Sequence, residues 1–214
     1  MGQVKLTKFG HACVRLEKDG KVLVIDPGTF TDAAALDGAD AVLITHNHFD
    51  HADRDKLLTL SPEVEVWTCE GVASGAAEAL PAKVQTVRHG DTFDTAGFGV
   101  KVFGEWHAAN HPDMPVVDNV GFLLDEEVFY PGDAFTVPDA SVGTLLVPTG
   151  APWLKLAEVV EYLRTVKAAR AYSTHDALYS DLGLGLVDNW LKMEADKQGA
   201  DIRRIAVGDS VTLS

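Results

Sequence analysis

The sequence predicts a layered α/β sandwich in a single domain that covers residues 1–214. Short apolar segments with the length of strands occur in both halves of the chain, and helix-like segments are interspersed among them. The chain is long enough for one well-buried core, or at most two small ones. It contains no linker, low-complexity tract or short repeat. Two similar halves would place a functional site at their junction.

Strands and turns dominate the first third of the chain. Residues 12–16 alternate between two faces, and the dipeptide Asp19-Gly20 turns the chain into an apolar run at residues 21–25. Residues 41–44 are entirely apolar, which is typical of a strand buried on both faces. Farther along, the pattern predicts helices at residues 54–60 and 70–80 and strands at residues 64–68, 84–87 and 100–103.

The second half repeats this mixture of elements. Residues 152–166 give the clearest amphipathic pattern, with Leu156, Val159, Val160 and Leu163 on one face of a helix. A final helix is predicted at residues 181–197, and strands are predicted at residues 121–124, 128–130, 144–147 and 171–174.

The charge balance is strongly acidic. There are 32 acidic and 18 basic residues, which gives a net charge of -14. Such a surface repels phosphate backbones, so nucleic acid is disfavoured as the main partner. The surplus carboxylates mainly favour solubility, and bound cations would neutralise some of them.

The cysteines and the apolar runs indicate in which cellular compartment the protein is expected. Cys13 and Cys69 are too few and too far apart for a disulfide framework or a thiolate metal site. No apolar run is long enough to insert into a membrane, and residues 1–9 lack the core of a signal peptide. We therefore expect a cytoplasmic protein with reduced thiols. The sequence does not determine the oligomeric state, and a homo-oligomer is compatible with it.

Three of the eight histidines fall within six residues, directly after the apolar run 41–44. Histidine is the commonest metal ligand, and loops at the carboxyl ends of strands are where α/β sheets usually place their chemistry. His46 and His48 are spaced to serve one metal, while Asp50 and His51 serve a second. A solvated polar loop is the alternative, but this spacing arises rarely by chance.

The run Thr45-His46-Asn47-His48-Phe49-Asp50-His51 resembles the T-H-x-H-x-D-H signature of the metallo-β-lactamase superfamily. Further matches follow the superfamily's order: a strand-end Asp26, the pair Gly132-Asp133, and the strand-end His175. The resemblance spans residues 4 to 180 and implies a four-layer αββα sandwich of two mixed β-sheets flanked by helices. It also implies a metal-dependent hydrolase that uses hydroxide bound to two divalent metal ions.

The ligands that the resemblance implies are His46, His48 and His107 for the first metal, Asp50, His51 and His175 for the second, and Asp133 between them. His107 and His111 compete as the middle ligand, and the family's motif placement favours His107. His111 is then a candidate substrate contact or proton donor. Zinc suits these ligands best, although manganese and iron fit as well.

The chemistry of such a pair of cations suggests roles for the nearby residues. Two cations lower the pKa of a shared water and polarise the carbonyl or phosphoryl oxygen under attack. Asp50 is the candidate that accepts a proton from the water, while Asp26 and Thr45 hold the imidazoles in place. His11 is interpreted as a structural histidine. Trp153 and Tyr179 either line the pocket or simply pack.

Within the superfamily, Gly10-His11-Ala12 and the Asp26 motif are similar to the ascorbate-6-phosphate lactonase-like branch. The loop from His46 to Asp53 is similar to N-acyl-phosphatidylethanolamine phospholipase D-like members. We expect hydrolysis of a small-molecule ester, lactone or phosphodiester. One alternative is a metal- and ligand-binding protein without turnover. The other is a β-lactamase-type amide hydrolase, which the absence of a signal peptide disfavours.

Overall fold

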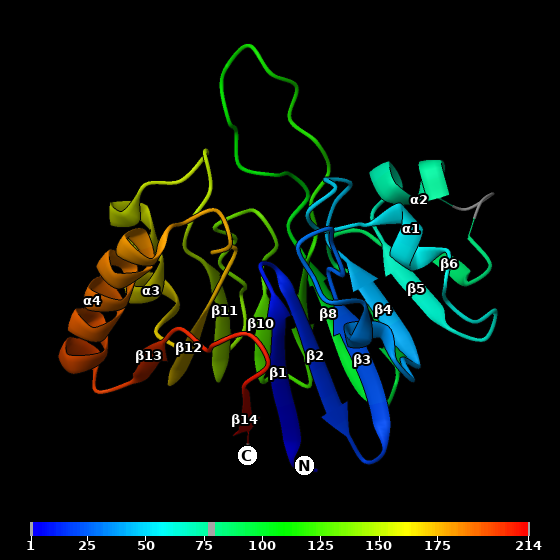
Figure 1. Cartoon of the computed structure of the whole chain (residues 1–214), viewed down its shortest axis with the longest axis horizontal. Helices are drawn as coiled ribbons and strands as arrows, with labels where there is room; N and C mark the ends of the chain where they lie inside the picture. Colours follow the sequence, from blue (N-terminus) through cyan, green and yellow to red (C-terminus); the bar gives the residue numbers. More distant parts are fainter. Residues whose placement is uncertain (1, 77–79, 214) are drawn as a thin grey trace.

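A computed structural model describes residues 2–76 and 80–213 of the chain and confirms the expected sandwich of two mixed sheets flanked by helices (Figure 1). Within the described residues each sheet has seven strands. None of the helices in these residues combines the length and the apolar character needed to cross a bilayer.

The first sheet has the order β14-β1-β2-β3-β4-β5-β6. The strands β3 to β6 run parallel, and the pairs β14–β1, β1–β2 and β2–β3 are antiparallel. Its strands are β1 (Val4–Gly10), β2 (Cys13–Lys18), β3 (Lys21–Ile25), β4 (Ala41–Ile44), β5 (Glu65–Thr68), β6 (Lys83–Thr86) and β14 (Ser210–Leu213).

The second sheet repeats this plan in the order β13-β12-β11-β10-β9-β8-β7. The strands β10 to β13 are parallel, and β7 to β10 are antiparallel. Its strands are β7 (Thr92–Thr95), β8 (Phe98–Phe103), β9 (Gly121–Leu124), β10 (Val128–Tyr130), β11 (Thr144–Pro148), β12 (Arg170–Thr174) and β13 (Asp201–Arg203). Because the parallel strands end at one edge of each sheet, the loops that follow them meet between the two halves.

Helices cover the outer faces of both sheets. Leu57 and Val72 bring α1 (Arg54–Leu57) and α2 (Glu70–Ala76) against the first sheet, and Val159 and Leu191 bring α3 (Leu156–Val166) and α4 (Asp181–Gln198) against the second. A short 3₁₀ helix, η1 (Ala33–Leu36), follows β3.

The helix expected at residues 54–60 is shorter in the structure. It ends at Leu57, because the N–H groups of Thr59 and Leu60 bond three residues back, and Pro62 follows. The structure describes the helix expected at residues 70–80 as far as Ala76, and residues 77–79 of that prediction lie outside the described part.

The helix expected from Pro152 begins only at Leu156. The indole of Trp153 donates a hydrogen bond to Asp133, so this segment is held at the sheet edge. The backbone N–H of Lys155 then donates to Glu158 and starts the helix one turn later.

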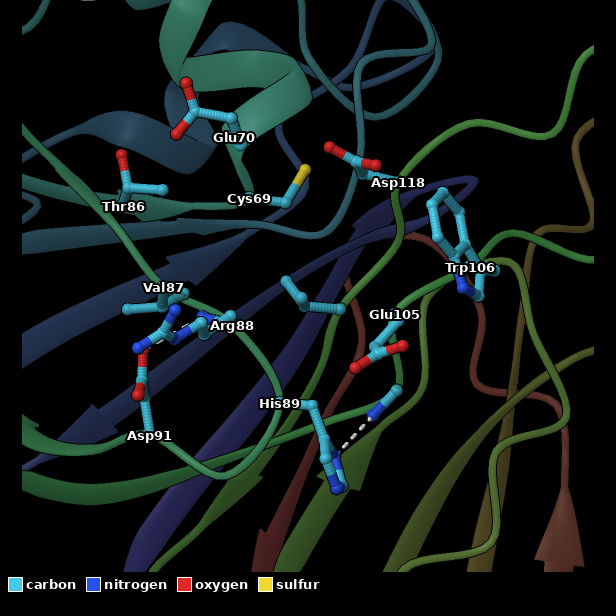
Figure 2. Close-up of a pocket in the computed structure, with 12 residues that line it drawn as sticks. Cys69, Glu70, Thr86, Val87, Arg88, His89, Asp91, Glu105, Trp106 and Asp118 are labelled. Atoms are coloured by element: carbon cyan, nitrogen blue, oxygen red, sulfur yellow. Dashed lines mark hydrogen bonds between the residues drawn. The ribbon is translucent and has the colours of Figure 1, made fainter.

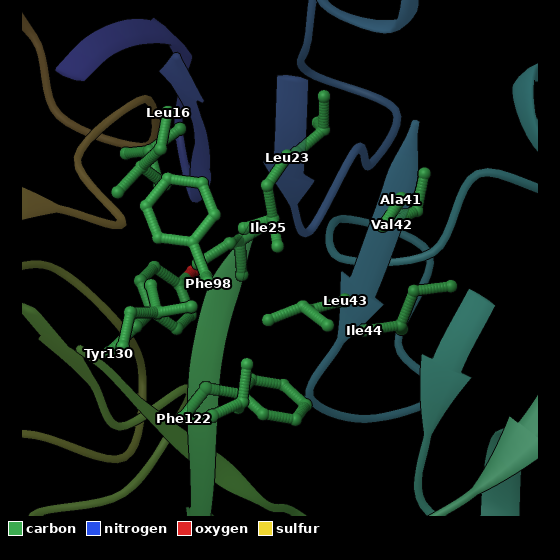
Figure 3. Packing of buried hydrophobic residues seen from close by; sticks show 14 of the residues in the cluster. Leu16, Leu23, Ile25, Ala41, Val42, Leu43, Ile44, Phe98, Phe122 and Tyr130 are labelled. Atoms are coloured by element: carbon green, nitrogen blue, oxygen red, sulfur yellow. The ribbon is translucent and has the colours of Figure 1, made fainter. Parts of the chain in front are cut away.

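The main core lies between the two sheets. Figure 3 shows Leu23, Ile25 and Leu43 of the first sheet facing Phe98 and Phe122 of the second. These side chains are buried, so the two sheets are joined chiefly by apolar contact. This packing fixes the distance between the loops that carry the site.

Candidate metal centre

The candidate metal ligands of the sequence gather at one edge of the sandwich. The loop after β4 carries His46, His48, Asp50 and His51, while the loops after β8, β10 and β12 carry His107, Asp133 and His175. Residues far apart in the chain thus meet where the two halves join.

Four side chains form a first group, His46, His48, His107 and Asp133, whose ligand atoms lie within 4.8 Å of one another. The ring centroids of His46 and His48 are 4.9 Å and 4.7 Å from that of His107. His46, His107 and Asp133 are buried, and His48 is half-buried. Three imidazoles and one carboxylate at this separation match the ligand preference of a divalent transition metal.

A second group, His11, Asp50, His51 and His175, also has its ligand atoms within 4.8 Å. Asp133 reaches this group as well: its Oδ1 is 3.2 Å from Nε2 of His51, and its Oδ2 is 3.1 Å from Nε2 of His175. The same Oδ2 is 3.3 Å from Nε2 of His107 in the first group. Asp133 therefore lies between the two groups.

Unsatisfied atoms indicate what the groups are built to hold. Among the described residues, Nε2 of His51, His107 and His175 and Oδ1 of Asp133 are buried without a hydrogen-bond partner. Such atoms are costly unless an ion or water satisfies them. Four of them converging on one place fit bound cations.

The hydrogen bonds of the Nδ1 atoms explain why Nε2 of each imidazole is free. Nδ1 of His107 and His175 donates to the carbonyls of Ala108 and Gly150, respectively, and Nδ1 of His51 lies 2.7 Å from Oδ2 of Asp26. Because a carbonyl only accepts, the proton of each neutral ring is on Nδ1. Nε2 is then left as the lone-pair donor that a metal requires.

Asp26 orders the loop after β4 from the neighbouring strand. Its two oxygens accept hydrogen bonds from the backbone N–H of Thr45 at 2.8 Å and the Thr45 hydroxyl at 2.7 Å. Asp26 has a φ of +50°, and His11 and His175 have φ of +40° and +56°. Non-glycine residues rarely adopt this conformation, and its concentration here is typical of a functional site.

The carboxylates make this edge favourable for positive charge. Burial lowers the pKa of His175, but Asp133 and Asp50 outweigh burial and raise it to about 9. Burial raises the pKa of Asp133, while the charge of the nearby His51 outweighs burial and holds it well below its usual range. The site therefore attracts protons or cations, which compete for the same nitrogens.

The structure separates the two candidates for the middle ligand. His107 is in the first group, whereas His111 is in neither group, and its side chain is 62% exposed. Nδ1 of His111 accepts a hydrogen bond from the backbone N–H of Asp113 within the long loop between β8 and β9. That loop extends away from the sheets, drawn in green in Figure 1. The role of His111 in substrate binding or proton donation stays a prediction.

The sequence predicts a structural role for His11, whereas the structure places it in the second group. Its Nε2 is 3.2 Å from Oδ2 of Asp50. The backbone N–H of His175 donates to its carbonyl oxygen, so the β1–β2 turn is tied to the loop after β12. The one local signal was Gly10, whose φ of +124° lets the chain turn here.

Two aromatic residues that the sequence left undecided also lie at this edge. The Trp153 indole donates to Oδ2 of Asp133 at 3.0 Å, and its ring is 5.8 Å from that of His107. The Tyr179 hydroxyl donates to the carbonyl of Thr149. Trp153 therefore contacts the first group directly, whereas Tyr179 braces a loop.

A cavity of about 660 Å³ lies beside the first group. Figure 2 shows Trp106, which directly precedes His107, together with Glu105, Asp118 and Cys69 around it. None of the residues of the two metal-binding groups lines this cavity. It is therefore an adjacent space and not the metal centre itself.

Comparisons with known proteins identify the family and the fold. The family model described as "Beta-lactamase superfamily domain" matches residues 5–175. Protein Rv0786c of Mycobacterium tuberculosis is 36% identical over 192 residues, covering 86% of this chain and 89% of that protein. A UPF0173 metal-dependent hydrolase of Geobacillus thermodenitrificans is 45% identical over 221 residues, covering 98% and 76% respectively.

Solved structures share the fold at low sequence identity. Igni18, a metallo hydrolase from Ignicoccus hospitalis, aligns with a TM-score of 0.75 and 19% identity over 99% of both chains. A metal-dependent hydrolase from Parabacteroides distasonis aligns with a TM-score of 0.76 and 20% identity over 95% of this chain and 93% of its own. The chain therefore belongs to the metallo-β-lactamase superfamily, among its UPF0173 metal-dependent hydrolases.

Proposed function

We propose that this hydrolase acts on a small ester, lactone or phosphodiester with the help of two divalent cations, zinc foremost. The observation that carries the proposal is the convergence of unsatisfied buried atoms from His51, His107, His175 and Asp133. When bound, the cations would supply a Lewis acid and a water of lowered pKa.

The proposed ligands are divided between the two groups. His46, His48 and His107 would hold one cation, Asp50, His51 and His175 would hold the other, and Asp133 would contact both. Zinc is proposed first because imidazole nitrogens make up most of the first set and half of the second, and manganese or iron would be favoured by more oxygen ligands or open positions.

The chain's own residues would position the reactants. Asp50 lies at the edge of the second group with its side chain partly exposed, so its carboxylate is accessible to a water and can accept a proton. Burial raises the pKa of Asp50, but the hydrogen bond from His11 and the charge of the nearby His51 hold it far below its usual range, so it stays ionised. The Trp153 indole fixes one oxygen of Asp133.

For the branch of the superfamily, we propose the lactonase-like and phospholipase D-like group. The resemblance rests on Gly10-His11-Ala12 and on the strand-end Asp26. Support comes from the position of both residues, because His11 contacts Asp50 and Asp26 contacts His51.

Metal content tests the proposal directly. We expect about two equivalents of metal in the wild type by mass spectrometry, and about one or fewer in His48→Ala, because each cation depends on its imidazoles. His111→Ala is the matched control and keeps the wild-type content, since His111 lies outside both groups.

Activity is then measured with p-nitrophenyl esters, a δ-lactone and bis(p-nitrophenyl) phosphate. We expect kcat/KM of His48→Ala to fall at least about 100-fold. A wild-type protein that stays empty after incubation with zinc, manganese and iron would refute the ligand assignment. One that binds metal but hydrolyses none of these classes would favour a binding protein without turnover.

A further inference from the structure

Two exposed phenylalanines lie directly beside the second group. Phe30 is 43% exposed and Phe49 is 64% exposed, and their rings meet edge to face with centroids 5.9 Å apart. The Phe30 ring also meets the His11 ring at 5.3 Å and 84°. Single exposed apolar residues are common, but two in contact with each other and with a site residue form a surface. We call this pair the phenylalanine platform.

The platform is held in place by backbone contacts and not only by its rings. The backbone N–H and the hydroxyl of Thr29 both donate to the carbonyl of Phe49, at 2.9 Å and 3.0 Å. Gly28 packs so closely against the backbone of Asp50 that a Cβ would lie 1.8 Å from its carbonyl oxygen. A preorganised apolar surface loses little entropy when a ligand covers it.

The ammonium group of Lys56, which reaches these loops, is already engaged. The Lys56 ammonium donates to the carbonyl of Gly28 at 2.9 Å and to the Asp53 carboxylate at 2.7 Å. The two exposed phenyl rings therefore offer an apolar surface without a free lysine ammonium beside it. Phe49 lies between His48 and Asp50 in the chain, and its ring is linked to the second group through Phe30, whose ring contacts His11.

We propose that the phenylalanine platform binds an apolar acyl or aryl group of the substrate next to the scissile bond. The proposal rests on the proposed function and narrows its substrate class to esters or lactones with a hydrophobic acyl part. In the reaction, water adds to the acyl carbon, the bond from that carbon to the leaving oxygen breaks, and the proton of the water passes to that oxygen.

The size of the effect follows from hydrophobic transfer. A fully buried methylene contributes up to about fourfold in binding, and one that contacts the platform on one side contributes about twofold. Lengthening an acyl chain from acetate to hexanoate adds four methylenes. We therefore expect kcat/KM to rise about 10-fold or more across p-nitrophenyl acetate, butyrate and hexanoate.

The test compares this rise in the zinc-loaded wild type, Phe30→Ala, Phe49→Ala and Leu186→Ala. Leu186 is the matched control, because it is an exposed apolar residue of α4 outside the site. We expect the hexanoate-to-acetate ratio to fall towards unity in both phenylalanine variants and to stay at the wild-type value in Leu186→Ala. A ratio that no variant changes would overturn the platform while leaving the proposed function intact. Metal content is measured on every variant, so that a lost ligand is not mistaken for a lost platform.

Calorimetry with octylphosphonate and methylphosphonate tests apolar binding by the platform independently of turnover. We expect octylphosphonate to bind the wild type at least about tenfold more tightly, with most of this difference lost in Phe49→Ala. Equal binding of the two probes would overturn the platform. A wild type that hydrolyses none of the esters but still prefers octylphosphonate would refute the proposed function alone. Loss of binding to phosphatidylcholine vesicles in Phe49→Ala, with no change towards either probe, would assign the two rings to a lipid surface instead.

Discussion

His11 offers a ring nitrogen to the second group, but its hydrogen bonds already assign its ring proton. The backbone N–H of Ala177 donates to Nδ1 at 3.2 Å, so Nδ1 carries no proton. Burial lowers the pKa of His11 despite its hydrogen bond to Asp50, so the ring is neutral and its one proton is on Nε2. That nitrogen faces Oδ2 of Asp50. A protonated ring nitrogen donates to a carboxylate and does not bind a metal.

We therefore expect His11 to orient Asp50 without binding a cation. In His11→Ala, the metal content stays at the wild-type value, while kcat/KM falls about 10- to 100-fold, as is typical when the partner of a metal ligand is removed. His11→Gln, which keeps a donor, recovers part of the loss. The measurement pairs metal analysis with steady-state kinetics, and the loss of one metal equivalent in His11→Ala would show that His11 is a ligand.

At the scale of elements, local signals explain which parts of the fold were predictable. The apolar run of β4 and the Asp19-Gly20 turn between β2 and β3 are encoded within a few residues, and both occur as expected. The edge strands β13 and β14 are short and alternate in polarity, and they form only because a distant strand is available to pair with them.

The candidate site follows the same rule. The run from His46 to His51 is contiguous, so its chemistry can be recognised from spacing alone. The function of His11 depends on the approach of the β1–β2 turn to Ala177, which no local pattern encodes. The choice between His107 and His111 likewise depends on the path of the loop between β8 and β9.

The loop after β3 and the loop after β4 meet at a position where only glycine fits. A Cβ on Gly28 would lie 1.8 Å from the carbonyl oxygen of Asp50 and 2.5 Å from the backbone nitrogen of His51. We expect Gly28→Ala to lower the free energy of unfolding by about 2–3 kcal/mol, since backbone must move. It should also weaken metal binding, because the displaced segment carries two proposed ligands.

Gly185→Ala provides the contrast. Gly185 is in α4, and a Cβ there has nothing within 4 Å, so alanine should stabilise the chain by up to about 1 kcal/mol. Urea unfolding after a chelator has removed bound metal measures the free energy of unfolding of each variant. Zinc titration measures metal binding. Equal stability of Gly28→Ala and the wild type would contradict the close approach of these loops.

At the scale of the whole molecule, the two halves are joined by a buried ion pair as well as by the apolar core. Lys8 of β1, in the first sheet, donates to the carboxylate of Asp176, which follows β12 in the second sheet. Their side chains are only 3% and 7% exposed. The same ammonium donates to the carbonyl of Ser173 at 3.2 Å. The pair thus holds the segment containing His175 against the first sheet.

We expect Lys8→Met to lower the free energy of unfolding by about 3–5 kcal/mol, because it leaves the buried Asp176 carboxylate without its partner. Lys5→Met is the matched control on the same strand: Lys5 pairs with Glu17 at the surface, where its side chain is 55% exposed, so its loss should cost less than about 1 kcal/mol. The double variant Lys8→Met/Asp176→Asn should regain part of the stability, since no unpaired charge remains. These cases are separated by urea unfolding of the wild type and the three variants, each treated with a chelator to remove bound metal. Equal losses in Lys8→Met and Lys5→Met would mean that the sheets are held by their apolar core alone.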